Sequence, residues 1–373
     1  MSWAIWITGP PGSGKSSLAR AAAAAVGARG EPVRVLELDE IRKTITPVPR
    51  YTDAERDIVY RALGYMALLV TEAGTGVIID ATAHRRAWRE LARQTIPRFA
   101  EVQVVCPAEV CRERERARSG GHAPTGIYAR AGQPGATVPG ADLPYELALS
   151  PELVVDSVAE PLPLSAARVA ELAERLALRS EPAVRATSPS WAIWITGRPG
   201  SGKSTLAERV AASLTSRDIA VRVLDYRSVE RRLLPDRPGS EPDHETVHRA
   251  LAYAAKLLTE VGVPVIVDAT APRRVWRETA RALIGCFAEV QLACSAEVCV
   301  ERERAARWGL GGESPPEARR PAPTPDVALG YEESLRPDLI VHTDVHDPWT
   351  TAEQVLFLAH RLHRMVSPSS EAS

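Results

Sequence analysis

The sequence "WITGPPGSGKSSLA" at residues 6–19 fits the phosphate-loop pattern G-x-x-x-x-G-K-[ST]. Glycines let such a loop curl so that its N–H groups face phosphates, while the lysine reaches the β- and γ-phosphates and the hydroxyl holds Mg²⁺. An apolar run precedes the loop and an alanine-rich run follows it, as strand and helix would, so a chance glycine turn explains it poorly. The pattern predicts a site for ATP and Mg²⁺ formed by Gly9, Gly12, Ser13, Gly14, Lys15, Ser16 and Ser17.

The same loop occurs again as "WITGRPGSGKSTLA" at residues 194–207, where Lys203 follows Lys15 by 188 residues. This register persists through "VIIDATAHRRAWRE" against "VIVDATAPRRVWRE" and through "FAEVQVVCPAEVCRERERAR" against "FAEVQLACSAEVCVERERAA". A repeat unit of about 180 residues is a whole domain, far longer than the unit of a solenoid. The second copy predicts a second nucleotide site, formed by Gly197, Gly200, Ser201, Gly202, Lys203, Ser204 and Thr205.

Each copy alternates strand-like and helix-like segments. In the first copy the expected strands are 3–8, 32–38, 76–80 and 100–106, and long helical patterns cover 14–26, 53–74 and 165–179. Strands separated by helices imply a parallel sheet covered on both faces. We therefore predict an α/β protein with two tandem P-loop NTPase domains, each a doubly wound parallel sheet, at 1–179 and 191–366, joined by a linker at 180–190 and followed by a disordered tail at 367–373.

The composition limits the other partners. The chain has 373 residues with 46 basic and 47 acidic side chains, so a net charge of −1 gives no general attraction to nucleic acid or to an anionic membrane. The five cysteines are odd in number and lack the C-x-x-C spacing of a zinc site, which favours a reduced cytoplasmic protein. We expect no targeting signal and no membrane span, and we leave a homo-oligomer open.

Phosphoryl transfer also needs acidic groups near the metal and the acceptor hydroxyl, and strand ends supply two candidates. Asp39 follows the second strand, with Arg42 one helical turn further on, and Asp80 ends "GVIID". Each acid has an alternative interpretation: Asp39 as a helix N-cap and Asp80 as a cap at a strand end. The run "CRERERAR" offers Arg112, Arg114, Arg116 and Arg118, either as a solvated ion-paired helix face or with one arginine closing over ATP.

Together, "GPPGSGKSSLA", "LELDEIRK", "ERDIVYRALGYMALL", "FAEVQVVCPAEVCRERE", "GIYARA" and "LPYELALSPELVVD" resemble adenylyl-sulfate kinases. These enzymes transfer phosphate from MgATP to the 3′-hydroxyl of adenosine 5′-phosphosulfate. The resemblance covers nearly all of residues 3–157 and extends more weakly over 191–344. It implies catalytic roles for Lys15, Asp39 and Arg42, with Asp39 and Ser16 near the metal. It also implies a lid role for Arg114 and substrate contacts for Arg42, Tyr51, Arg56, Arg61 and Thr82.

The sequence departs from the family pattern chiefly around the acceptor. Leu38 replaces a glycine, Val59 an asparagine between the two substrate arginines, and Val138 a phenylalanine that stacks on the substrate. Glu37 is the first acid of its segment, and Thr125 stands where a lysine is usual. The alternatives are therefore a P-loop kinase of another small hydroxyl acceptor, such as a nucleoside, sugar or antibiotic, and a nucleotide-sensing regulatory protein.

The second copy keeps its loop but changes its acceptor positions. At the offset of 188 residues, Arg227 stands opposite Asp39, Glu230 opposite Arg42, Gly239 opposite Tyr51 and His244 opposite Arg56. Three of these changes reverse or remove charge, and "GESPPEARRPAPTP" replaces the "GIYARA" segment, although Arg249, Asp268 and Arg302 persist. We predict that the second half binds nucleotide and has lost the transfer reaction.

Overall fold

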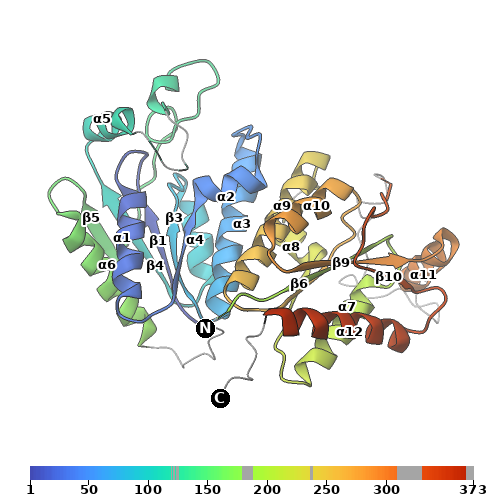
Figure 1. Cartoon of the computed structure of the whole chain (residues 1–373). Coiled ribbons are helices and arrows are strands. Elements are labelled where there is room, and N and C mark those ends of the chain that lie inside the picture. Colours follow the sequence, from blue (N-terminus) through green and yellow to red (C-terminus); the bar gives the residue numbers. More distant parts are fainter. Residues whose placement is uncertain are drawn as a thin grey trace. The chain divides into compact units, whose positions relative to one another are not determined.

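The computed structural model describes residues 1–118, 120, 122, 126–178, 188–235, 238–308 and 330–366. The chain divides into two compact units, Met1–Arg185 and Ala186–Ser373, each built around its own sheet (Figure 1). The expected linker, apart from residues 188–190, and the expected tail lie outside the described residues, as do Thr125 and residues 312–325.

The first unit alternates strands and helices along the chain. Its elements are β1 (Ala4–Thr8), α1 (Lys15–Gly27), β2 (Val33–Glu37), α2 (Leu38–Ile45), α3 (Asp53–Glu72), β3 (Gly76–Asp80), α4 (Arg86–Thr95), β4 (Phe99–Val105), α5 (Ala108–Ala117), the 3₁₀ turn η1 (Tyr128–Arg130), β5 (Leu153–Asp156) and α6 (Leu162–Ala177). The sheet is parallel, with the order β2-β3-β1-β4-β5.

Alternation along β1 explains why both faces of this sheet are covered. Trp3, Ile5 and Ile7 pack with α1 and α6 on one face, while Trp6 lies within 6.5 Å, centroid to centroid, of the ring of Tyr60 on α3. Helices α1 and α6 cover one face and α3 and α4 the other (Figure 1). Because successive strand residues point to opposite faces, an almost continuous apolar strand such as "AIWIT" belongs at the centre of a doubly wound sheet.

The second unit repeats this plan. Its elements are β6 (Ala192–Gly197), α7 (Lys203–Thr215), β7 (Arg222–Asp225), α8 (Tyr226–Leu233), α9 (Glu241–Glu260), β8 (Val265–Asp268), α10 (Arg274–Leu283), β9 (Phe287–Ala293), α11 (Ala296–Trp308), β10 (Leu339–His342) and α12 (Pro348–Val366). The order β7-β8-β6-β9-β10 is that of the first sheet, and Trp191, Ile193 and Ile195 pack with α7 and α12. Among the described helices, none combines the length and apolar composition that crossing a membrane requires.

The predicted fold class is confirmed in both units. Two details differ from the sequence prediction: β2 ends at Glu37, so Asp39 is the second residue of α2 rather than part of a strand end, and a fifth strand, β5, completes the sheet. In a parallel sheet all carboxyl ends meet at one edge, so this topology brings the P-loop, Asp39 and Asp80 to the same edge.

Candidate active site

The P-loop of the first unit connects β1 to α1. Gly12 and Gly14 have φ angles of 77° and 95°, and a Cβ atom at Gly12 would lie 2.2 Å from the carbonyl oxygen of Cys111 on α5. Only glycine fits so close an approach at positive φ. Lys15 is 8% exposed and donates a hydrogen bond from Nζ to the carbonyl oxygen of Pro10 at 3.0 Å. The backbone is therefore curled as phosphate binding requires.

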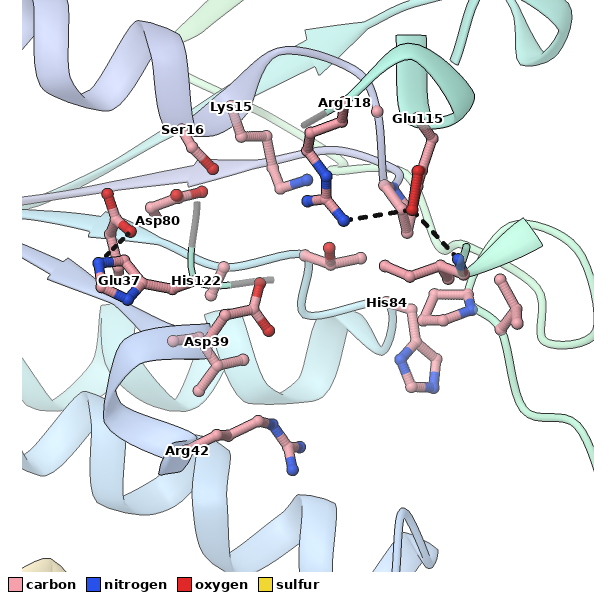
Figure 2. Close-up of a pocket in the computed structure, with 18 of the residues that line it drawn as sticks. Lys15, Ser16, Glu37, Asp39, Arg42, Asp80, His84, Glu115, Arg118 and His122 are labelled. Carbon is pink, nitrogen blue, oxygen red and sulfur yellow. Dashed lines mark hydrogen bonds and ion pairs between the residues drawn. The ribbon is translucent and has the colours of Figure 1, made fainter. Parts of the chain in front are cut away.

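Asp80 lies beside this loop because β3 is the neighbour of β1. In the register of the sheet Asp80 is opposite Ile7, and Ile7 is two residues before Gly9, the first glycine of the P-loop. Burial raises the pKa of Asp80, and the charge of Lys15 and a hydrogen bond with Ser16 oppose that shift. Burial likewise lowers the pKa of Lys15 against the charges of Asp80 and Asp39. Figure 2 shows Lys15, Ser16 and Asp80 at the same side of the cavity.

These side chains fit a magnesium ion by the chemistry of their donors. The Ser16 hydroxyl and the Asp80 carboxylate already contact each other at the start of α1, and both are oxygen ligands. Mg²⁺ prefers oxygen and usually combines one or two protein ligands with water and substrate phosphates. The carboxyl group of Asp39 is a further candidate on the same cavity wall.

Asp39 is not a helix cap. Helix α2 begins at Leu38 with Glu37 at the N-cap position, and no side-chain hydrogen bond caps this end. Asp39 therefore lies in the first turn, and it lines a cavity of about 800 Å³ that begins at the P-loop. The alternative interpretation of Asp39 as an N-cap is thus removed by the geometry, and a role inside the cavity is left.

The other end of the cavity is lined by arginines around one tyrosine. The guanidinium carbons of Arg42 and Arg56 lie 5.3 and 5.9 Å from the ring centroid of Tyr51. Glu55, 2% exposed, accepts hydrogen bonds from Arg42 Nη1 at 3.4 Å and from the Tyr51 N–H at 3.2 Å. Tyr51 itself has a φ of 54°, an unusual value for a tyrosine. Thr82 and Val138 also line this cavity.

Two arginines approach the P-loop differently: Arg114 on α5 and Arg118, which directly follows α5. Arg114 donates from Nη1 to Ser157 Oγ at 2.9 Å and from Nη2 to the Ser157 carbonyl at 3.0 Å. Arg118 donates from Nη2 to Glu115 Oε1 at 3.2 Å, and its charge contributes to lowering the pKa of Lys15. Both arginines line the cavity, but Arg118 is the one drawn facing Lys15 in Figure 2. The sequence offered four arginines of the run "CRERERAR", including both of these, and the family resemblance pointed to Arg114.

Arg61 is the predicted substrate residue that the structure does not bring to this site. It is absent from the described residues that line the cavity, and its Nε donates to Asp57 Oδ2 at 2.8 Å, four residues earlier on α3. Arg249 makes the same pair with Glu245 at 2.8 Å in the second unit. A pair kept in both halves is consistent with a role on the helix surface.

At the mouth of the cavity, one ligand atom each from Glu37, Glu40 and His122 lies within 4.8 Å of the others. Basic side chains already occupy this cluster: Arg20 contacts Glu37 at 2.7 Å, and Lys43 contacts His122 at 3.1 Å. We assign no metal to these three residues, because Arg20 already pairs with Glu37 and exposed acidic groups often gather without a metal.

The second unit keeps the nucleotide side of the site. Lys203 Nζ donates to the carbonyl oxygens of Gly197 and Arg198, each at 3.0 Å. Burial raises the pKa of Asp268, and Lys203 and a hydrogen bond with Ser204 oppose that shift, as around Asp80. Arg302 Nη2 donates to the carbonyl of Thr343 at 2.7 Å, which corresponds to the contact of Arg114 with Ser157.

The acceptor side of the second unit differs from that of the first at the positions of Leu38 and Arg56, which are Tyr226 and His244. The rings of Tyr226 and His248 stack at 4.2 Å, and those of His248 and Trp276 at 4.5 Å. Tyr226 Oη lies 2.8 Å from Nδ1 of His244, and His244 is the residue at the position equivalent to Arg56. A Cβ atom at Gly239 would lie 2.9 Å from the His244 ring, so this backbone leaves no room for a counterpart of Tyr51.

The fold and loop chemistry define a phosphotransferase of the P-loop class, and comparison with known proteins gives its family. Residues 1–156 and 189–310 match the adenylylsulphate kinase family, so the chain belongs to that family. A probable adenylyl-sulfate kinase of Archaeoglobus fulgidus is 37% identical over 160 residues, which are 42% of this chain and 97% of the relative. One of Pyrococcus abyssi is 38% identical over 156 residues, 41% of this chain and 84% of the relative.

Among solved structures, the APS kinase of Mycobacterium tuberculosis in complex with AMPPNP and APS is 28% identical, with a TM-score of 0.42. The similarity covers 46% of this chain and 98% of that one. The predicted family, its presence in two copies and the predicted class of enzyme, a kinase, are confirmed by the family match.

Proposed function

We propose that the first unit transfers the γ-phosphoryl group of ATP to the 3′-hydroxyl of adenosine 5′-phosphosulfate. One observation carries this proposal: a single cavity joins the P-loop lysine to the arginine and tyrosine cluster that the family uses for its acceptor. Donor and acceptor can therefore meet in one cavity, and positioning the two is the main requirement for phosphoryl transfer.

On the donor side, the loop N–H groups and Lys15 would hold the β- and γ-phosphates. Ser16 and Asp80 would hold Mg²⁺, which supplies neutralisation of the charge on the transferred group when it is bound. Arg118, within the electrostatic reach of Lys15, would contribute a further positive charge, and Arg114 would keep α5 against the loop after β5.

On the acceptor side, Asp39 would orient the attacking hydroxyl, since it lines the cavity near Lys15 and is not engaged as a cap. Arg42 and Arg56 would pair with the anionic end of the acceptor, and Tyr51 would pack against its base. Thr82 lies on the same wall, and we retain it as a substrate contact. For Arg61 we retain no substrate role.

We also propose that the second unit binds nucleotide without transferring phosphate to adenosine 5′-phosphosulfate. Its P-loop contacts support binding, and its acceptor side has lost the charge of Arg56, with His244 at that position in contact with Tyr226. Such a unit would stabilise or regulate the first. That the protein resides in the cytoplasm, and whether it forms a homo-oligomer, stay predictions.

One observation favours a second candidate, a kinase of another small hydroxyl acceptor. Val138 lines the cavity at 7% exposure where the family has a stacking phenylalanine, so the base would be held by an aromatic ring on one face only. A sugar or a smaller nucleoside would need less stacking surface.

A coupled assay of ADP release separates the two candidates. Adenosine 5′-phosphosulfate and a panel of nucleosides, sugars and aminoglycosides would be compared at equal concentration, with the full-length Lys15→Ala protein as the background control. The proposal expects the highest kcat/KM with adenosine 5′-phosphosulfate. A higher value with any other acceptor would identify the second candidate as correct.

A further inference from the structure

Two buried nitrogen atoms of the first unit belong to residues that line the cavity and have no hydrogen-bond partner among the described residues. They are Nη1 of Arg56 and Nδ1 of His84. The two residues are 5% and 3% exposed, and both line the cavity. A buried polar atom without a partner is costly, so proteins rarely keep one that no ligand satisfies.

Each of the two side chains is held in place by contacts that do not involve its unpartnered nitrogen. Arg56 Nη2 donates to the carbonyl and the hydroxyl of Thr137, at 2.7 and 2.8 Å, which fixes the guanidinium plane. The His84 ring meets the Trp88 ring edge-on, with centroids 5.1 Å apart. Trp88 is itself fixed, because its Nε1 donates to Asp57 Oδ1 at 2.9 Å and its ring stacks on Tyr60 at 4.2 Å.

The His84 ring is uncharged at neutral pH. Burial, together with the charges of Arg56 and Arg85, lowers its pKa to about 4, against the opposing charges of Asp53 and Glu146. The neutral ring can therefore donate one N–H without adding a charge. Figure 2 shows His84 among the side chains around the cavity.

We propose that His84 is a further acceptor-binding residue, which donates from Nδ1 to an anionic oxygen that Arg56 Nη1 also contacts. The guanidinium supplies the charge, and the imidazole supplies a second, neutral donor. This inference rests on the proposed function, in which the acceptor carries an anionic phosphosulfate group. The second unit has lost both members, with His244 at the position of Arg56 and Pro272 at that of His84.

The test uses the full-length protein and three substitutions. His84→Ala removes the donor, whereas His84→Asn places an amide N–H close to the position of Nδ1. His346→Ala, at an exposed histidine of the second unit, is the matched control. We expect His84→Ala to raise the KM for adenosine 5′-phosphosulfate about tenfold and to change kcat and the KM for ATP less than threefold. His84→Asn should recover most of that loss.

A competitive inhibitor distinguishes anion binding from a general effect on the cavity. Adenosine lacks the anionic group, so its inhibition constant should be the same in wild type and His84→Ala. The proposal is overturned if the inhibition constant of adenosine rises as much as the KM for adenosine 5′-phosphosulfate, or if the KM for ATP rises instead. In either case His84 does not hold the acceptor's anion.

A binding measurement separates failure of this inference from failure of the proposed function. The imidazole nitrogen signals of His84, assigned by their loss in His84→Asn, would be followed by NMR during titration with inorganic sulfate. A sulfate-dependent shift supports the anion subsite even if adenosine 5′-phosphosulfate is not phosphorylated. Unchanged signals at saturating sulfate contradict it, whatever the substrate proves to be.

Discussion

The two acceptor regions began as one sequence and now differ in charge: Arg42 and Arg56 of the first unit are replaced by Glu230 and His244 in the second. In the first unit Arg42 and Arg56 lie against the Tyr51 ring, and all three line the cavity of about 800 Å³ that begins at the P-loop. In the second, Tyr226, 4% exposed, stacks on His248 and contacts His244. Replacing a buried arginine by a histidine that contacts a tyrosine removes the cost of a buried charge, and it also removes a charge that an anionic acceptor would need.

What both halves have kept is equally informative. Arg89 forms an ion pair with Glu101 at 2.6 Å, and Arg277 forms one with Glu289 at 2.8 Å, and both arginines are fully buried. Both also donate to the carbonyl of an alanine with positive φ, Ala83 in the first unit. These pairs fix the turn after the third strand, so the architecture persists where the acceptor chemistry does not.

The largest expected effect comes from the P-loop lysines. Lys15→Ala should reduce turnover by about 10³-fold or more, because the ammonium that balances charge on the transferred phosphate is lost. Lys203→Ala should leave turnover within about threefold of wild type and instead lower the number of ATP molecules bound per chain. Steady-state kinetics and equilibrium ATP binding on both full-length variants check this. Equal losses of turnover in the two variants would show that both units transfer phosphate.

Next in size is the effect of Asp39→Asn, compared with Arg227→Asn at the equivalent position. If Asp39 orients the acceptor hydroxyl, kcat should fall by about 10²-fold or more while ATP affinity changes little, since the lost interaction forms mainly in the transition state. Arg227→Asn should change neither quantity. A lower melting temperature with normal kcat in Asp39→Asn would assign Asp39 a purely structural role.

A smaller effect is expected from the acceptor arginine. Arg42→Ala should raise the KM for adenosine 5′-phosphosulfate by about 10- to 100-fold, the range of a charged hydrogen bond, with the KM for ATP nearly unchanged. Glu230→Ala, at the equivalent position of the second unit, should alter neither constant. An equal rise of the KM for ATP and of the KM for adenosine 5′-phosphosulfate in Arg42→Ala would contradict this prediction, because Arg42 would then act on the cavity as a whole.

The sequence predicted the parts of the site that depend on local pattern. The P-loop glycines, Lys15 and the parallel sheet follow from a motif and from strand and helix periodicity, and the family resemblance identified Arg42, Tyr51 and Arg56. Asp80 could not be preferred over a strand cap, because its position beside Ser16 depends on β3 being the neighbour of β1, and strand order is a tertiary property. His84 gave no signal, since its buried nitrogen is defined by packing on Trp88.

Arg61 shows a limit of another kind. It follows Arg56 by five residues, and at 100° per residue of a helix the two side chains point in directions that differ by about 140°. One face of α3 could therefore not present both arginines to the same cavity. Asp57, four residues before Arg61, is its natural partner on the helix surface, and the two are paired at 2.8 Å.

The smallest expected effect concerns the packing of the second unit and its response to pH. His248 is fully buried, and desolvation lowers its pKa well below the usual 6.5. Below pH 6.5 the unfolded chain therefore binds a proton that the folded unit does not, so the free energy of unfolding decreases as the pH falls.

His248→Tyr restores the residue of the first unit, where Tyr60 Oη accepts a hydrogen bond from the Ala83 N–H at 3.1 Å. In this variant, the loss of stability between pH 7 and 5.5 should be smaller than in wild type by about 1 kcal/mol.

Hydrogen exchange of the slowest amides of β6 and β8, corrected for intrinsic rates, measures the opening free energy of the second unit. The amides of β1 and β3 of the same molecule are the internal control. An equal pH dependence of β6 and β8 in wild type and His248→Tyr would contradict this prediction. It would mean that the folded unit accommodates a charged His248 among the stacked rings.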